Sequence, residues 1–175
     1  KHYFVIRRNK GWQIINSEGE SVTVKKYSFM SVLKPNRILV RSDKRYGVID
    51  LSEKTVIPVK YQKFSEVSDG IFLTKLNGYW GVLDIDNNVL LENDCERIKP
   101  LYDTLVIKRY GKYGLMRVDG KLLYEPKFDK IKRMGEYILL KDINDSKTAA
   151  LKLIDLLKGL NVDKPRNLAK SVTVE

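Results

Sequence analysis

The chain has 175 residues, and its 33 lysines and arginines outnumber its 22 aspartates and glutamates, which gives a formal net charge of +11 at pH 7. Apolar residues make up 43% of the chain, enough for a core, which excludes a wholly disordered protein, and no apolar run reaches the roughly 18–20 residues needed to span a bilayer. One cysteine, Cys95, and one histidine, His2, exclude an internal disulfide and disfavour metal sites and histidine-dependent catalysis. We therefore expect no metal, no cofactor and no enzyme activity.

Short apolar runs that end in a base recur along the chain and predict β-strands. They occupy residues 4–7, 38–41, 72–75 and 105–108, with a fifth at 137–141. Neighbouring residues of a strand point to opposite faces, so three consecutive apolar positions indicate a strand covered on both sides. Asn77-Gly78 and Tyr110-Gly111 follow two of the runs and predict tight hairpins, because such turns need positive φ angles.

A second strand begins at an aromatic anchor after each hairpin. The anchors are spaced by 34, 34 and 33 residues, and they are Trp12, Tyr46, Trp80 and Tyr113. A third block recurs at residues 56–64 and 122–131, with Pro58 and Pro126 expected at a strand end or a sheet edge. Each unit is thus predicted to be a three-stranded antiparallel meander, or one with a short fourth strand at residues 63–67.

A unit of this size cannot bury its own faces and must stack on the next unit. We expect the anchors to be core residues that link successive units. The glycine that follows most anchors is expected to let a ring of a neighbouring element lie against the backbone.

The order aromatic-Gly-Val-Ile-Asp, polar turn, Val-Ile-Pro resembles the bacterial tryptophan-glycine repeat, also known as the WG or KWG repeat. The best copies are residues 46–64 and 80–84, and the resemblance covers about 4–141. The copies depart from it where Gln13 replaces the glycine and where residues 92–95 lack the proline. The resemblance implies β-rich repeats that serve interaction, with no established common activity.

The end of the chain breaks the pattern. We predict a capping helix over residues 146–159, with Ser146 as N-cap and Gly159 as its stop, followed by a tail at 160–175. The alternative aligns residues 148–152 with the aromatic-Gly strand. The repeat array then occupies residues 1–145, as an open curved stack of mainly β structure or, alternatively, a small β-propeller.

A base lies five residues before each anchor and forms a candidate basic ladder. Its members are Arg7, Arg41, Lys75 and Lys108. The ladder could dock a polyanion such as nucleic acid, or an acidic protein surface. The simpler interpretation is a solvated strand end, whose base pairs with Asp50 or Asp84 on the adjoining strand. The calcium-like run at residues 84–88 lacks the glycine and the glutamate of a calcium loop, so we expect a turn there, and Cys95 is expected to be a small half-buried residue.

These features predict a non-catalytic interaction or scaffold module that presents a basic surface to a macromolecular partner, with no small-molecule substrate. A protein is the preferred partner, and the alternative is a nucleic-acid-binding accessory domain. Because the first residue is Lys1, we expect a processed product or an excised piece. The residues upstream would decide between a bacterial cytoplasm and the cell envelope.

Overall fold

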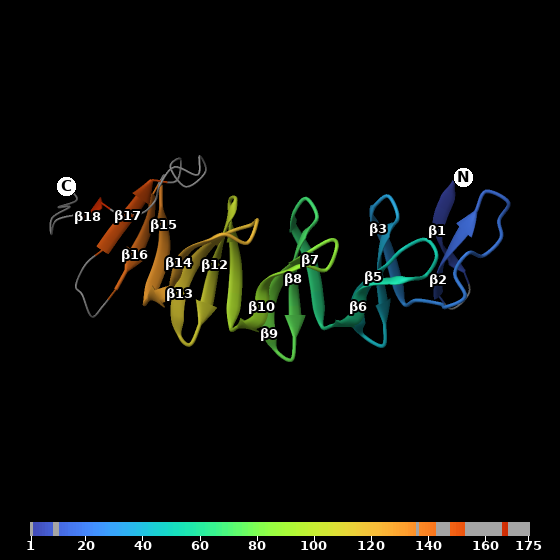
Figure 1. The fold of residues 1–175 in the computed structure, drawn as a ribbon, viewed down its shortest axis with the longest axis horizontal. Helices are drawn as coiled ribbons and strands as arrows, with labels where there is room; N and C mark the ends of the chain where they lie inside the picture. The colour runs from blue at the N-terminus through green and yellow to red at the C-terminus, as the bar shows by residue number, and fades with distance from the viewer. Residues whose placement is uncertain (1, 9–10, 136, 143–147, 153–165, 168–175) are drawn as a thin grey trace. The chain divides into compact units, whose positions relative to one another are not determined.

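The computed structural model describes residues 2–8, 11–135, 137–142, 148–152 and 166–167. Every regular element among them is a β-strand, which confirms the mainly β prediction (Figure 1). The described part of the chain holds no helix with the length and apolar character of a membrane span.

The strands form small antiparallel sheets that follow one another along the chain in two compact units, residues 1–93 and 94–175. Unit 1 holds three sheets. The first consists of β1 (Tyr3–Arg8) and β2 (Gly11–Asn16), and the second of β3 (Phe29–Lys34), β4 (Arg37–Ser42), β5 (Arg45–Ile49) and β6 (Thr55–Tyr61). The third consists of β7 (Lys63–Ser68), β8 (Ile71–Leu76), β9 (Tyr79–Asp84) and β10 (Val89–Cys95), and the last residues of β10 belong to unit 2. Unit 2 holds a sheet of β11 (Arg97–Leu101), β12 (Thr104–Arg109), β13 (Lys112–Arg117) and β14 (Leu122–Phe128), and a sheet of β15 (Lys130–Met134), β16 (Tyr137–Lys141), β17 (Thr148–Lys152) and β18 (Arg166–Asn167). Strand order is linear in each, and none of these sheets closes on itself.

The repeating sheet has four strands rather than three. The short strand predicted at residues 63–67 exists as β7, but it is the first strand of the next sheet and not the last of its own. The cause is its pairing with β8, in which Lys63 lies opposite Lys75 and the Gln62 N–H donates to the Lys75 carbonyl at 2.8 Å. The sheets that begin with β7, β11 and β15 therefore each start two residues after the end of the preceding sheet.

The hairpin between β8 and β9 and the hairpin between β12 and β13 use the predicted turn residues. Asn77 and Gly78 have φ angles of 51° and 90°, and Tyr110 and Gly111 have 50° and 76°. Two consecutive positive φ angles are the signature of the type I′ turn, whose twist matches that of the strands. The hairpin prediction is confirmed at both places.

The glycine after the anchor makes room for backbone, not for an aromatic ring as the sequence suggested. A Cβ atom on Gly47 would lie 2.6 Å from the Ile57 carbonyl oxygen, and one on Gly114 would lie 2.6 Å from that of Tyr124. At these places the fourth strand bulges, as shown by the shifts in register between β5 and β6 and between β13 and β14. Pro58 and Pro126 lie in these bulged edge strands, where a missing N–H breaks no ladder bond.

Within each unit the core lies between consecutive sheets, as stacking requires. In unit 1 one cluster joins residues of the first two sheets, including Ile14, Met30 and Val40, and another joins the second and third sheets around Ile57 and Phe72. In unit 2 a cluster joins the two sheets; its buried members are Leu115, Phe128, Ile138 and Leu140. Within each unit, a sheet buries its apolar faces against its neighbour in the chain.

The capping helix is wrong over residues 148–152, which form strand β17. Thr148 pairs with Lys141 and Ala149 with Leu140, so Ala149 takes the register position that Gly114 holds opposite Ile107. Pairing with β16 supplies the backbone hydrogen bonds that a helix would have provided, and it overrides the helical spacing of the sequence. The rest of the predicted helix lies outside the described residues, as does the predicted tail except for β18, which pairs with β17.

Candidate anion-binding surface

The predicted ladder bases lie directly opposite the aromatic anchors across the hairpin. The pairs are Arg7 and Trp12, Arg41 and Tyr46, Lys75 and Trp80, and Lys108 and Tyr113. In three pairs the cation also lies over the ring: Arg41 Cζ is 5.5 Å from the Tyr46 centroid, and the Nζ atoms of Lys75 and Lys108 are 5.5 and 5.7 Å from the centroids of Trp80 and Tyr113. Each of these three bases therefore makes a cation–π contact, which is worth about 0.5–1 kcal/mol at exposed sites.

The interpretation that pairs these bases with Asp50 or Asp84 is wrong, because both carboxylates are used within their own turns. Asp50 Oδ1 accepts the N–H groups of Ser52 and Lys54 at 2.9 Å each, and hydrogen bonding, led by the Ser52 hydroxyl, lowers the pKa of Asp50. Asp84 Oδ1 accepts the N–H groups of Asp86 and Asn88 at 2.9 and 2.8 Å. The calcium-like run at 84–88 is thus a turn in which Asp84 bonds to the backbone.

The anchors are half-buried rather than core residues. One side of Trp12 packs on the first core cluster of unit 1, while the rings of Tyr46, Trp80 and Tyr113 support a cation. The buried position is instead the residue fifteen places after each anchor, and it is occupied by Tyr27, Tyr61, Cys95 and Phe128. Cys95 is therefore completely buried, not half-buried as expected, and burial raises its pKa to about 11.

Sequence reasoning missed a second row of bases. On the other side of the ladder strand, Lys63 lies opposite Lys75, Arg97 opposite Lys108, and Lys130 opposite Lys141. Like charges directly opposite one another in a sheet are destabilising. The signal was present in the sequence, because each base of the second row follows the buried residue of the third block by two places, at Tyr61, Cys95 and Phe128.

One of these like-charge pairs is compensated by a carboxylate. Glu96 Oε2 lies 2.9 Å from Lys108 Nζ, and Glu96 Oε1 accepts the Gly111 N–H at 2.6 Å. The hydrogen bond to Lys108 lowers the pKa of Glu96 and raises that of Lys108, whereas the positive charge of Arg97 acts on Lys108 in the opposite direction. The positive charge of Arg97 thus opposes the charged form of Lys108 across β11 and β12, and Glu96 outweighs it.

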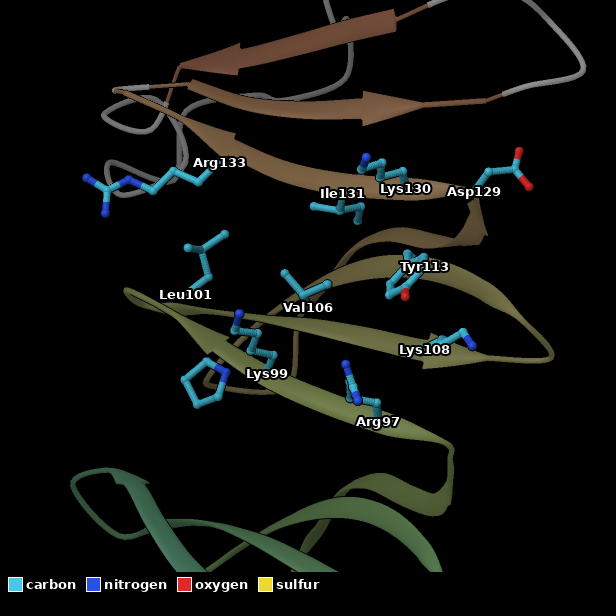
Figure 2. Close-up of a pocket in the computed structure, with 11 residues that line it drawn as sticks. Arg97, Lys99, Leu101, Val106, Lys108, Tyr113, Asp129, Lys130, Ile131 and Arg133 are labelled. Atoms are coloured by element: carbon cyan, nitrogen blue, oxygen red, sulfur yellow. The ribbon is translucent and has the colours of Figure 1, made fainter.

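A cavity of about 460 Å³ in unit 2 collects several of these bases (Figure 2). It opens between β11, β12 and β13 on one side and β15 on the other, and its lining residues are Arg97, Lys99, Pro100, Leu101, Val106, Lys108, Tyr113, Asp129, Lys130, Ile131 and Arg133. Its one lining carboxylate, Asp129, forms an ion pair with Lys112 at 2.6 Å. The lining therefore carries five cations and one anion, and the anion is neutralised by a lysine that does not line the cavity.

Arg133 is held in place at one end of this cavity. Its guanidinium carbon lies 4.9 Å from the ring centroid of Tyr102, in the turn between β11 and β12, and its Nε donates to the Gly135 carbonyl at 3.1 Å. Among the described residues, the hydrogen bonds and ion pairs of Arg133 do not use its terminal nitrogens. No group of three or more His, Cys, Asp or Glu side chains within the described ranges is placed to hold a metal ion.

Residues 46–80 match a family model described as WG containing repeat. A curated relative, the glutamine–fructose-6-phosphate aminotransferase (isomerizing) of Lactiplantibacillus plantarum, is 43% identical over 56 residues, which cover 27% of this chain and 9% of that protein. The chain spans less than a tenth of that relative.

Solved structures of similar arrangement include a eukaryotic initiation factor, with a TM-score of 0.45, 6% identity and coverage of 99% of this chain and 53% of that chain. Another is KlHsv2 with loop 6CD replaced by a Gly-Ser linker, with a TM-score of 0.39, 12% identity and coverage of 85% and 58%. Scores below 0.5 carry no argument about function. The match at residues 46–80 confirms the resemblance seen in the sequence: this chain contains a repeat of the WG family.

Proposed function

We propose that this chain is a non-catalytic module that binds an acidic protein surface through its rows of bases. One observation carries the proposal: the same like-charge pair recurs across the first two strands of three successive sheets, at Lys63/Lys75, Arg97/Lys108 and Lys130/Lys141. Like charges directly opposite one another cost the folded chain free energy, and in the Arg97/Lys108 pair the carboxylate of Glu96 offsets part of that cost through its ion pair with Lys108. An anionic partner would relieve that cost. The recurrence of these pairs therefore supports a role in binding rather than in folding.

The state of the aromatic anchors supports a protein partner over a nucleic acid. Nucleic-acid-binding surfaces that combine bases with aromatics stack nucleobases on free ring faces. Here Tyr46, Trp80 and Tyr113 each have a cation of the same hairpin over the ring. We infer that the bases meet carboxylates at the surface while the rings hold the bases in place.

We also propose the open stack over the propeller, because within each unit a sheet packs on the next in the chain.

Binding of the 175-residue chain to fluorescein-labelled polyglutamate, followed by anisotropy during a sodium chloride titration, tests this function. We expect binding that weakens as salt rises, because both partners are charged and exposed. A triple variant, Lys63→Gln, Arg97→Gln and Lys130→Gln, should bind more weakly than the control of equal net charge, Lys25→Gln, Lys54→Gln and Lys121→Gln. Equal losses in the two variants, or no binding, would overturn the proposal. Tighter binding of a single-stranded oligonucleotide would favour the nucleic-acid alternative.

A further inference from the structure

The unit 2 cavity has an aliphatic floor. Leu101 of β11, Val106 of β12 and Ile131 of β15 are half-buried, pack on the edge of the unit 2 core cluster and point toward one another across the cavity (Figure 2). Its volume of about 460 Å³ falls within the range of pockets that bury a small ligand or a few side chains. An aliphatic group that entered it would remove this floor from water.

The walls of the cavity are basic. Arg97 and Lys99 project from β11, and Lys130 and Arg133 come from β15. The ion pairs among the described residues involve none of these four side chains. A ligand for this cavity must therefore be anionic at its ends and aliphatic in its middle.

The aromatic rings at the cavity disfavour a stacked base. Lys108 lies over the ring of Tyr113, and Arg133 lies over the ring of Tyr102. A nucleobase would have to displace one of these cations before it could stack on that ring face. A carboxylate would instead meet Arg97, Lys99 or Arg133 without any displacement.

We propose that this cavity binds a short acidic peptide segment of the partner, with one aliphatic side chain on the floor formed by Leu101, Val106 and Ile131 and carboxylates against the basic walls. The inference rests on the proposed function and narrows it to one site in unit 2. Apolar anchors flanked by complementary charges are a common way for a groove to select a peptide. The aliphatic anchor gives affinity, and the four bases select acidic flanks.

The test uses the whole chain and two labelled peptides: one with a single leucine between two runs of glutamate, and one with serine in place of that leucine. We expect the leucine peptide to bind several-fold more tightly. The double variant Arg97→Glu with Lys130→Glu should weaken its binding about tenfold or more, which corresponds to about 1.4 kcal/mol. The control Lys25→Glu with Lys54→Glu makes the same change in net charge at exposed residues outside the base rows and the cavity, and it should change its binding less than about twofold.

The floor is tested separately with Ile131→Ser, which should abolish the preference for leucine over serine while polyglutamate binding persists. Thermal melts of all variants show whether each remains folded. If Ile131→Ser does not fold, the charge variants and the two peptides still test the proposal. Equal binding of the two peptides, or an equal effect of the Lys25→Glu, Lys54→Glu control, would overturn the cavity while leaving the proposed function intact. Loss of polyglutamate binding by the unaltered chain would overturn both.

Discussion

The hairpin of β8 and β9 in unit 1 and that of β12 and β13 in unit 2 have the same backbone register but compensate their charges differently. In unit 1 the turn glycine, Gly78, donates to Gln62 Oε1 at 3.0 Å. In unit 2 the corresponding Gly111 donates to Glu96 Oε1 at 2.6 Å, and Glu96 also pairs with Lys108. Both turn glycines thus donate to a side-chain oxygen, which belongs to an amide in unit 1 and to a carboxylate in unit 2.

The same two regions differ at the buried position of the third block. This position is the last residue of each of three four-stranded sheets. It is Tyr61 at the end of β6, Cys95 at the end of β10 and Phe128 at the end of β14. All three side chains are buried, and the rings of Tyr124 and Phe128 meet edge to face with centroids 5.8 Å apart. The three residues at this position thus share burial, whereas the size of the side chain differs from sheet to sheet.

The largest effect should come from emptying this position. Phe128→Ala removes a ring that is 7% exposed from the unit 2 core, and we expect a loss of about 4 kcal/mol in the free energy of unfolding. Cys95→Ala, at the same repeat position, should cost only about 1 kcal/mol because it removes a single buried sulfur. Urea denaturation of both variants measures the two losses in the free energy of unfolding. Losses of similar size would contradict the expectation that the cost at this repeat position follows the size of the side chain removed.

A second effect should be equal in the two units. Gly47→Ala and Gly114→Ala each place a Cβ 2.6 Å from a backbone carbonyl oxygen of the bulged edge strand, which cannot move aside as a side chain can. We expect each to lose about 3 kcal/mol of unfolding free energy. Thr55→Ala, an exposed position on β6, is the control and should change stability by less than about 0.5 kcal/mol. A tolerated alanine at either glycine would contradict the proposed close approach of the backbones.

The smallest effect concerns the acceptor of the turn glycine. Glu96→Gln reproduces the unit 1 arrangement and should lower the melting temperature slightly at neutral pH, because it removes the ion pair with Lys108. The pKa of Glu96 is lowered from 4.5 in the folded chain, so its contribution is present above that value and is lost as the pH falls through the folded pKa. The melting curves of Glu96→Gln and the unaltered chain should therefore converge in acid. Gln62→Glu should introduce a similar pH dependence in unit 1, and its failure to do so would show that Glu96 depends on features peculiar to unit 2.

Much of the fold could be predicted because its signals are local. The spacing of Trp12, Tyr46, Trp80 and Tyr113, the Asn77-Gly78 turn and the apolar runs each depend on residues close together in the chain. The ladder bases were found for the same reason, since each precedes its anchor by five residues. The second base row and the cavity could not be found in this way, because Lys130 and Arg97 reach the cavity from strands of different sheets.

Two of the predictions that were wrong, the capping helix and the place of the strand at residues 63–67, also failed because strand pairing decided them. The sequence predicts a helix over residues 146–159, but the edge of β16 offers backbone partners to residues 148–152, and pairing decides the outcome there. Strand 63–68 was assigned to the wrong sheet, because a strand between two hairpins can pair with either neighbour and only the registered contact of Lys63 with Lys75 decides.

The sequence by itself determined that this protein is a β repeat of the WG type, where its hairpins turn and which bases stand before the anchors, because a period of 33 or 34 residues repeats the same short-range preferences. Tertiary structure alone decided where each sheet begins, that the bases face one another in like-charge pairs, and that four of them surround an aliphatic floor. The reason is that cross-strand register and the packing of one sheet on the next join residues that no local pattern connects.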